Sequence, residues 1–529
     1  MKFTMRDYQT DWCRDVWKAV EHGVEGNTFT RVLGCAATGA GKTIMATALI
    51  EKWREREKRC LFIADTDELC TQAVEKMHKA AGIIADLEKA ESRASKLSPV
   101  VVGSIQTLAN ASRFDRFEPN HFDRIIADEA HLSMADNWQR VLKRFNEGGA
   151  RIVGITATPE RSDGIPLMSF YEHMAHEIPL FTLIDRKHLS PILVRTVPLE
   201  ITITGKVKEG EMEDVAAQLE AYTAAIIDAL EQFAADRKKV LIFHPSVNAS
   251  KRFTEALQAR GISARHVDGN SPDRREILAG YARGDFRVLN NAQLLMKGYD
   301  EPTVDCVIIL RPTKSRTAYI QMVGRGTRLF CPHGCDGWCE HSDRKQNMLL
   351  LDFLWQFPGM NVMAPACLAT DKPEQAAAIQ KKLREGKGDA LDIMAVDAAA
   401  LSEREEQLVS ALKRAGKKRA MILDARQFGA VMHQPELMDY EPRAAWQSQD
   451  MTPKQASALR NFGVDPATVK GKGHASALLS FLFGRMKSGG ATVKQVLMLS
   501  EFGIENALEF TKDAASVRIG EELNRRRSA

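Results

Sequence analysis

The length, composition and charge of the chain exclude several classes of protein. With 529 residues it is too long for one hydrophobic core, so we expect three or four domains, and no apolar run reaches the roughly 18–20 residues that span a bilayer. Nine cysteines are too few for a disulfide scaffold of this length, and a net charge of +4 does not by itself indicate nucleic acid.

The first 17 residues are charged throughout and lack the apolar stretch of a secretory signal. We therefore expect a cytoplasmic protein, or a nuclear one if its cell has a nucleus, with no membrane partner. Residues 1–195 then alternate short apolar runs with helical patterns, which is typical of a parallel sheet with crossover helices. The expected strands are Arg31–Cys35, Cys60–Ala64, Val100–Val102, Arg124–Ala127 and Ile152–Ile155.

The same alternation resumes in residues 206–360 and predicts a second α/β domain. The expected strands there are Val240–Phe243, Ala264–Val267, Arg287–Leu289, Cys306–Leu310 and Met348–Leu351. Residues 365–450 lose the β-branched runs and read as a helical linker or bracing region, with an amphipathic helix over Leu401–Ala415.

A glycine-rich loop follows the first expected strand and opens a helix. It reads AATGAGKT from Ala36 to Thr43, with alanine where the usual pattern begins with glycine. Glycines let successive backbone N–H groups face phosphates, and the helix N-terminus adds its positive end. The loop predicts an ATP site in which Lys42 holds the outer phosphates and Thr43 offers its hydroxyl to Mg²⁺. The residues expected to bind the nucleotide are Thr38, Gly39, Gly41, Lys42 and Thr43.

Two adjacent carboxylates, Asp128 and Glu129, end the Arg124–Ala127 strand in the sequence DEAH. One carboxylate there can hold Mg²⁺, and a second can orient and deprotonate the attacking water. Because the two residues are adjacent, their side chains point in different directions. We assign Asp128 to Mg²⁺ and Glu129 to the water.

Together these motifs resemble the superfamily 2 helicases and translocases, and the resemblance covers residues 1–355. It implies two RecA-like domains, in which Gln9 reads the adenine edge and Gly154–Pro159 links hydrolysis to domain movement. The segments Ala64–Leu69 and Gly103–Thr107 resemble those that touch the nucleic-acid backbone. In the second domain, Ile242-Phe243 and Gly298–Asp300 stand at the fourth and fifth motifs, and Gly298 and Asp300 are expected at the nucleotide.

The sixth motif, Gln321–Arg328, carries two arginines. Phosphoryl transfer requires that negative charge be neutralised on both sides of the terminal phosphate. An arginine supplied by a second domain neutralises the charge on one of these sides. Arg325 and Arg328 complete the site only when the cleft closes, which couples hydrolysis to domain motion. We count Gln321, Arg325 and Arg328 with Lys42, Asp128 and Glu129 as the catalytic set.

The branch of the family is indicated by Gly154–Arg161 and Arg311–Arg328, which look most like the XPB- and RadD-like DNA helicases and translocases. Restriction motor subunits of types I and III are relatives of that branch. The sixth motif begins with Gln321 rather than the His-Arg of DEAD-box RNA helicases. Met296-Lys297 stands where Thr-Glu is common, so Lys297 would partly replace a hydroxyl contact to a backbone phosphate.

A cysteine-rich loop at residues 331–341 follows the second arginine. Cys331, Cys335, Cys339 and His341 could form a tetrahedral zinc site, with His333 as an alternative ligand. The spacing C-x₃-C-x₃-C-x-H is not the common C-x₂-C pair. A loop of reduced thiols, or an iron–sulfur cluster, which more usually takes four cysteines, is the alternative.

The last 79 residues contain an internal repeat at a constant offset, which predicts a duplicated helical unit over 451–529. Thr452, Gln455, Leu459 and Phe462-Gly463 recur as Thr492, Gln495, Leu499 and Phe502-Gly503. Twelve Lys/Arg against seven Asp/Glu give this segment +5, while the rest of the chain is near neutral. We expect an accessory DNA contact, or else a helical domain that touches the motor or a partner protein.

The sequence therefore predicts an α/β fold of two tandem RecA-like domains, followed by a helical C-terminal region. The expected function is an ATP-dependent DNA helicase or translocase in repair, recombination or replication, with ATP, Mg²⁺ and zinc as cofactors. An RNA helicase, and a DNA-binding scaffold that uses ATP as a switch without processive movement, are the alternatives.

Overall fold

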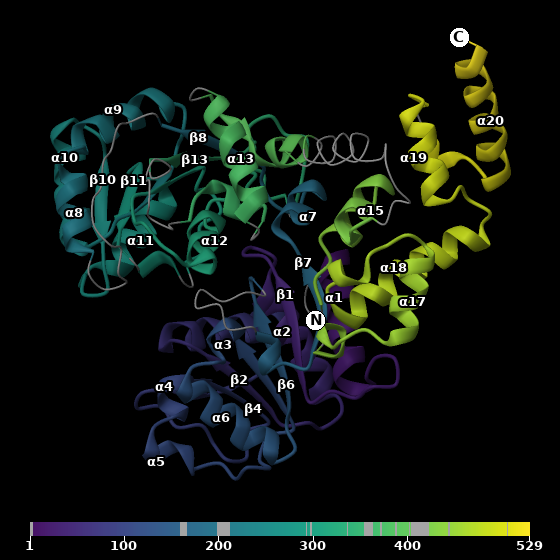
Figure 1. Ribbon diagram of the computed structural model, residues 1–529. Helices are drawn as coiled ribbons and strands as arrows, with labels where there is room; N and C mark the ends of the chain where they lie inside the picture. Colours follow the sequence, from purple (N-terminus) through teal and green to yellow (C-terminus); the bar gives the residue numbers. More distant parts are fainter. Residues whose placement is uncertain are drawn as a thin grey trace. The chain divides into compact units, whose positions relative to one another are not determined.

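The computed structural model describes residues 4–158, 167–197, 212–292, 294–296, 299–335, 337–353, 363–370, 373–386, 389–400, 403, 423–442, 445–504 and 506–528. The chain separates into two compact units, Met1–Ala398 and Ala399–Ala529 (Figure 1). Among the described residues, no helix combines the length and apolar character needed to cross a bilayer.

The first sheet has seven parallel strands, and the five strands between its two edges are buried along most of their length, as parallel strands between helical layers are. Their spatial order is β3 (Asp86–Glu88), β4 (Val100–Ser104), β2 (Cys60–Ala64), β5 (Arg124–Asp128), β6 (Arg151–Thr156), β1 (Arg31–Ala36) and β7 (His173–Ile178). All five strands expected in residues 1–195 are present.

Helices follow these strands, and local signals fix several of their ends. Helix α3 begins where Thr66 Oγ1 accepts a hydrogen bond from Leu69 N, and it ends at Gly82, whose φ is 69°. The other helices of this lobe are α1 (Asp7–Glu21), α2 (Lys42–Arg54), α4 (Ile105–Leu108), α5 (Ala111–Phe114), α6 (Asp136–Glu147) and α7 (Leu180–Asp185), with α3 itself at Asp67–Ala81 and short 3₁₀ turns η1 (Ala130–Leu132) and η2 (Leu167–Ser169).

The second sheet also has seven strands, parallel except for its last member. The order is β10 (Ala264–Val267), β11 (Val288–Asn291), β9 (Val240–Phe243), β12 (Cys306–Ile309), β13 (Met348–Asp352), β8 (Ile192–Thr196) and β14 (Leu391–Asp392). Strand β8 pairs with β13, so the second lobe begins before residue 195, where we had placed the end of the first domain. The two RecA-like sheets confirm the expected fold class.

The helices of the second lobe are α8 (Glu213–Glu220), α9 (Thr223–Phe233), α10 (Val247–Ala259), α11 (Arg274–Arg283), α12 (Arg316–Gly324) and α13 (Pro373–Glu385), with η3 (Leu294–Met296) and η4 (Pro365–Leu368). The expected linker over 365–450 is divided, because β14 pairs with β8 while residues from Leu423 onward pack in the core of the second unit. The helix expected over Leu401–Ala415 lies, apart from Glu403, outside the described residues.

The second unit is helical and confirms the duplication. In each copy a capping glutamine joins the starts of two helices: Gln455 Nε2 donates to Ser476 Oγ (2.9 Å), and Gln495 Nε2 donates to Ser516 Oγ (2.8 Å). The helices are α15 (Ala425–Val431), α16 (Pro435–Met438), α17 (Pro453–Asn461), α18 (Gly471–Lys487), α19 (Val493–Glu501) and α20 (Lys512–Ser528), with η5 (Ala445–Ser448), η6 (Pro466–Thr468) and η7 (Ala507–Glu509).

Candidate nucleotide-binding and hydrolysis site

The loop between β1 and α2 has the backbone shape that the glycine pattern predicts. Gly39 and Gly41 adopt left-handed φ angles of 91° and 84°. A Cβ at Gly41 would lie 2.6 Å from Gln9 Nε2, so a larger residue would strain the backbone and displace the Gln9 amide. Lys42, the first residue of α2, donates from Nζ to Ala36 O (3.2 Å) and folds back over the loop.

The start of α1 is tied to this loop. Gln9 Nε2 donates to Ala40 O (2.9 Å), its Oε1 accepts from Arg6 N (3.0 Å), and Tyr8 Oη donates to the same Ala40 carbonyl (3.0 Å). Gln9 is buried, and both ends of its amide are engaged within the protein. The adenine contact expected for Gln9 stays a prediction.

The two carboxylates lie where β5 ends. Glu129 has a left-handed backbone (φ 52°, ψ 51°), a strained conformation for a non-glycine residue that is common at functional sites. Burial and the neighbouring Glu129 raise the pKa of Asp128 to about 6, although Lys42 opposes the shift. Burial also lowers the pKa of Lys42, against the attraction of both carboxylates.

Helix α12 of the second lobe brings the sixth motif onto these groups. Gln321 Nε2 donates to Glu129 Oε1 (3.0 Å), and Thr317 Oγ1 lies 2.7 Å from Thr158 Oγ1. A Cβ at Gly324 would lie 2.6 Å from Thr38 Cβ, so the end of α12 packs directly on the phosphate loop. The contacts join Gly154–Thr158, the described part of the segment expected to link hydrolysis to movement, to the second lobe.

Both arginines of the sixth motif contact residues of the fifth motif. Arg325 Nη1 donates to Tyr299 O (2.6 Å), and Arg328 Nη1 forms an ion pair with Asp300 Oδ1 (2.7 Å). Burial lowers the pKa of Arg325 to about 10, so its guanidinium stays charged at neutral pH. Gly298, expected at the nucleotide, and Lys297 lie outside the described residues.

The expected ATP residues surround one cleft of about 560 Å³. Among the described residues expected at the nucleotide or in catalysis, Gln9 is the one absent from its lining. Sequence reasoning missed three polar side chains of α3 that also line the cleft, Gln72, Lys76 and Lys79. Their signal was weak: two lysines three residues apart on a helix are usually a solvated face. The expected residues lining the cleft are Thr38, Gly39, Gly41, Lys42, Thr43, Asp128, Glu129, Asp300, Gln321, Arg325 and Arg328.

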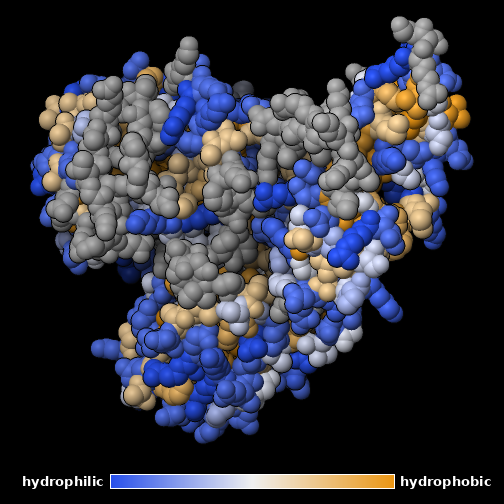
Figure 2. Space-filling view, in the orientation of Figure 1, coloured by the Kyte–Doolittle hydropathy of each residue, from blue (hydrophilic) through white to orange (hydrophobic). Residues whose placement is uncertain are grey.

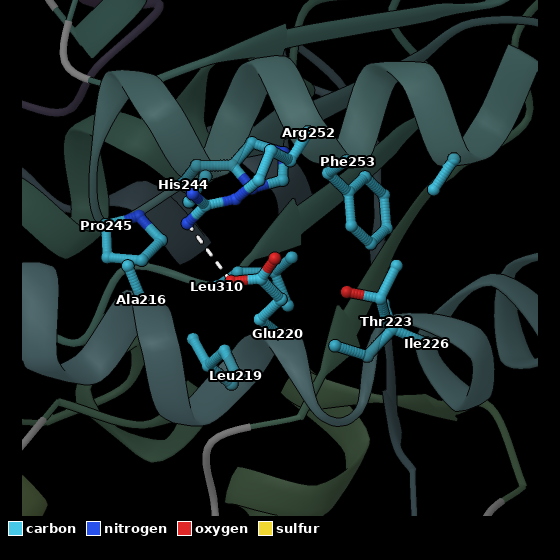
Figure 3. A pocket seen from close by; sticks show the side chains of 12 residues that line it. Ala216, Leu219, Glu220, Thr223, Ile226, His244, Pro245, Arg252, Phe253 and Leu310 are labelled. Carbon is cyan, nitrogen blue, oxygen red and sulfur yellow. Dashed lines mark ion pairs between the residues drawn. The ribbon is translucent and has the colours of Figure 1, made fainter.

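A separate cavity of about 250 Å³ lies within the second lobe, between α8, α9 and α10 (Figure 3). Its lining is mostly apolar, and Arg252 pairs with Glu220 across it (3.1 Å). Burial lowers the pKa of His244 to about 4, so this imidazole is neutral near pH 7 and shares a hydrogen bond with Asn290 (2.9 Å). The cavity has no glycine-rich loop and no carboxylate pair in its lining.

The cysteine-rich loop brings the four expected ligands together. One donor atom from each of Cys331, Cys335, Cys339 and His341 lies within 4.8 Å of the others. His341 Nδ1 is 3.5 Å from both Cys331 Sγ and Cys335 Sγ, whereas His333 Nε2 faces Asp343 Oδ2 (3.1 Å). Three thiols and one imidazole are a donor set that suits Zn²⁺.

Comparison with known proteins agrees with this geometry. Residues 2–161 match the family model for the res subunit of type III restriction enzymes, and residues 223–329 match that for the helicase conserved C-terminal domain. A Saccharomyces cerevisiae protein named as an ATP-dependent helicase, IRC3, is 27% identical over 360 residues, 61% of this chain and 49% of that protein. The Escherichia coli type I restriction enzyme EcoAI endonuclease subunit is 24% identical over 370 residues, 61% of this chain and 44% of that protein.

Two solved structures share the fold. The type ISP restriction-modification enzyme LlaBIII bound to DNA aligns with a TM-score of 0.52 at 14% identity, over 98% of this chain and 41% of that one. A Vibrio vulnificus YJ016 fragment assigned as a type I HsdR subunit aligns with a TM-score of 0.50 at 22% identity. The alignment covers 65% of this chain and 63% of that one. This chain spans about half the length of the yeast and E. coli relatives. The two matched domains and the motifs that meet in the cleft show that the chain belongs to the superfamily 2 helicases of the DEAD/DEAH-like type, which are ATP-dependent enzymes.

Proposed function

We propose that this protein is a DNA helicase or translocase that couples ATP hydrolysis to movement on DNA, of the XPB- and RadD-like branch. One observation carries the proposal: Lys42 and Glu129 of the first lobe line the same cleft as Arg325 and Arg328 of the second. A site divided between two lobes lets hydrolysis change the contact between them, and that change is what a motor needs.

In the proposed reaction, the backbone of the glycine loop and Lys42 hold the outer phosphates. Thr38 supports this placement, because its buried Oγ1 has no hydrogen-bond partner within the described part of the chain and its residue lines the cleft. Glu129 orients a water and takes its proton as the water attacks the terminal phosphorus, and the bond from that phosphorus to the bridging oxygen breaks so that ADP leaves. Arg325 and Arg328 stabilise the charge that spreads over the phosphoryl oxygens.

Thr43 and Asp128 are the proposed Mg²⁺ ligands. A hydroxyl and a carboxylate are hard oxygen donors of the kind that Mg²⁺ prefers, and both residues line the cleft. Bound there, Mg²⁺ would supply charge neutralisation for the phosphates. The raised pKa of Asp128 shows that burial disfavours its charged form. A bound cation would stabilise that charged carboxylate, which supports this role.

Zinc in the cysteine-rich loop is a second proposal, supported by the convergence of three thiols and His341. We expect about one zinc per chain in protein purified without added metal, measured by elemental analysis. The control is Cys367→Ser, which changes a buried cysteine outside the loop. Equal zinc content in Cys335→Ser and the parent would overturn the assignment.

The duplicated unit is proposed as an accessory contact to DNA. Lysines recur at equivalent positions near the starts of its helices, Lys454 and Lys494 in the first helix of each copy and Lys472 and Lys512 in the second. The alternative is a protein partner, which the apolar side chains around α19 and α20 favour (Figure 2). Val517 and Leu523 of α20 are among the exposed large hydrophobic residues.

The preference for DNA is supported by the named activity of restriction relatives and by the DNA held in the LlaBIII structure. The test compares ATPase stimulation by single-stranded DNA, duplex, forked DNA and RNA, together with displacement of a triplex strand that reports movement. We expect DNA to stimulate more than RNA and the triplex strand to be released with ATP. Greater stimulation by RNA identifies an RNA helicase, and stimulation without release identifies an ATP switch.

A further inference from the structure

Lys345 connects two segments of the second lobe through one ammonium group. Its Nζ donates to the carbonyl oxygens of Pro302 (2.8 Å), Val304 (3.0 Å) and Gly326 (3.0 Å). An ammonium has three N–H donors, so all three are used. Burial lowers the pKa of Lys345 to about 7, so keeping the charge here has a cost that the carbonyl contacts offset.

These carbonyls belong to the two segments that carry the arginine contacts. Gly326 lies between Arg325 and Arg328, and Pro302 and Val304 continue directly from Tyr299 and Asp300, which those arginines hold. Three positively charged side chains, those of Arg325, Arg328 and Lys345, therefore contact the short segment 299–304.

Gly326 has no freedom to shift toward the sheet. A Cβ there would lie 2.5 Å from Met348 Cγ and 2.9 Å from Val307 Cγ2, so its backbone is packed against β13 and β12. Lys345 Nζ donates to the carbonyl oxygen of this packed glycine. Lys345 N also donates to Phe330 O (2.9 Å), which closes the base of the cysteine-rich loop.

We propose that Lys345 is a positioning residue for ATP hydrolysis, which fixes the arginine-bearing turn against segment 299–304. When Arg325 and Arg328 move from Tyr299 and Asp300 to a phosphate, Lys345 keeps both backbones in place. The arginines then return to defined positions after each turnover. The proposal rests on the proposed roles of the two arginines.

The primary test is Lys345→Met, which keeps the apolar stem and removes the charge and the donors. We expect kcat to fall by about 10- to 100-fold, because small displacements of catalytic groups have effects of that size, with the ATP dissociation constant within about twofold of the parent. Lys239→Met is the matched control. Lys239 is buried, whereas Lys345 is partly buried; it donates to Ala282 O (2.7 Å) and lies 3.6 Å from Glu301 Oε1, but among the described residues it makes no hydrogen bond to the 324–328 turn.

Two further measurements keep the test decisive. Lys345→Arg retains the charge but cannot place one nitrogen on three carbonyls, so it carries the kinetic test if the methionine variant does not fold. Hydrogen exchange of the peptide covering 324–328, which Lys345 contacts through Gly326 O, should rise in the Lys345 variants and not in Lys239→Met, whether or not the parent hydrolyses ATP. A folded Lys345 variant with kcat within twofold of the parent, or with exchange equal to that of Lys239→Met, overturns the proposal. An inactive parent with the predicted exchange difference would contradict the motor function alone.

Discussion

Gln321 Nε2 donates a 3.0 Å hydrogen bond to Glu129 Oε1, and so joins the arginine-bearing helix of the second lobe to the carboxylate proposed to activate water. His131 Nδ1 approaches the other carboxylate oxygen of Glu129 to 3.3 Å from within the first lobe. The base is therefore oriented from both lobes, and its position depends on how closely α12 approaches.

Replacing Gln321 with alanine should lower kcat by about tenfold or more while leaving ATP affinity near that of the parent. The reason is that Gln321 orients Glu129 and does not support the phosphate loop, so its loss acts mainly in the transition state. Steady-state turnover and binding of a fluorescent ATP analogue measure the two effects. A variant that loses affinity and keeps kcat would place Gln321 at the nucleotide instead.

Glu129→Gln should bind ATP yet turn over about 10²- to 10⁴-fold more slowly, the range expected when a general base is removed. The substitution keeps the size of the side chain and its acceptor for Gln321. Lys42→Ala is the contrasting variant, because loss of its charge removes phosphate binding itself. Substantial turnover by Glu129→Gln would refute the assigned role.

Asp128→Asn should abolish Mg²⁺-dependent turnover and raise the melting temperature of the free protein. The pKa of about 6 in the folded protein exceeds the ordinary aspartate pKa of 3.8, so between these values the folded state binds a proton that the unfolded chain has lost. The free energy of unfolding therefore falls as the pH rises from 3.8 to about 6. The neutral amide of Asp128→Asn does not ionise, so the variant does not lose this stability. Thermal unfolding should show a larger gain at pH 8 than at pH 5. An equal gain in melting temperature at pH 8 and pH 5 would mean that ionisation of Asp128 does not affect the stability of the folded protein.

Changing Lys454, Lys472, Lys494 and Lys512 to glutamine should weaken DNA binding and leave ATP turnover without DNA unchanged. Each lost phosphate contact should make the plot of log affinity against log salt shallower by roughly 0.7–0.9. Substitution is a cleaner test than removing residues 451–529, because Leu423 and Phe428 share a core with that segment. Lys487→Gln, at the other end of α18, is the control. An unchanged slope would assign the repeats to protein contacts.

The sequence predicted the strands and motif order because buried parallel strands are nearly continuous apolar runs, as in Leu61–Ile63, and because phosphate chemistry permits few residue types. Strand β7 was missed: it reads HMAHEI at the sheet edge, where polar side chains remain partly exposed. Strand β14 has two residues and exists only because it pairs with β8. Lys76 and Lys345 could not be found from the sequence, since their partners lie in other segments and the meeting is set by tertiary packing.

The steady-state rate of ATP hydrolysis by the full chain, with and without single-stranded DNA, tests the central claim most directly. Lys42→Ala, prepared identically, gives the background. The account predicts Mg²⁺-dependent turnover that rises when DNA is added and is absent from Lys42→Ala. Turnover no greater than that of Lys42→Ala, with DNA present, would contradict it.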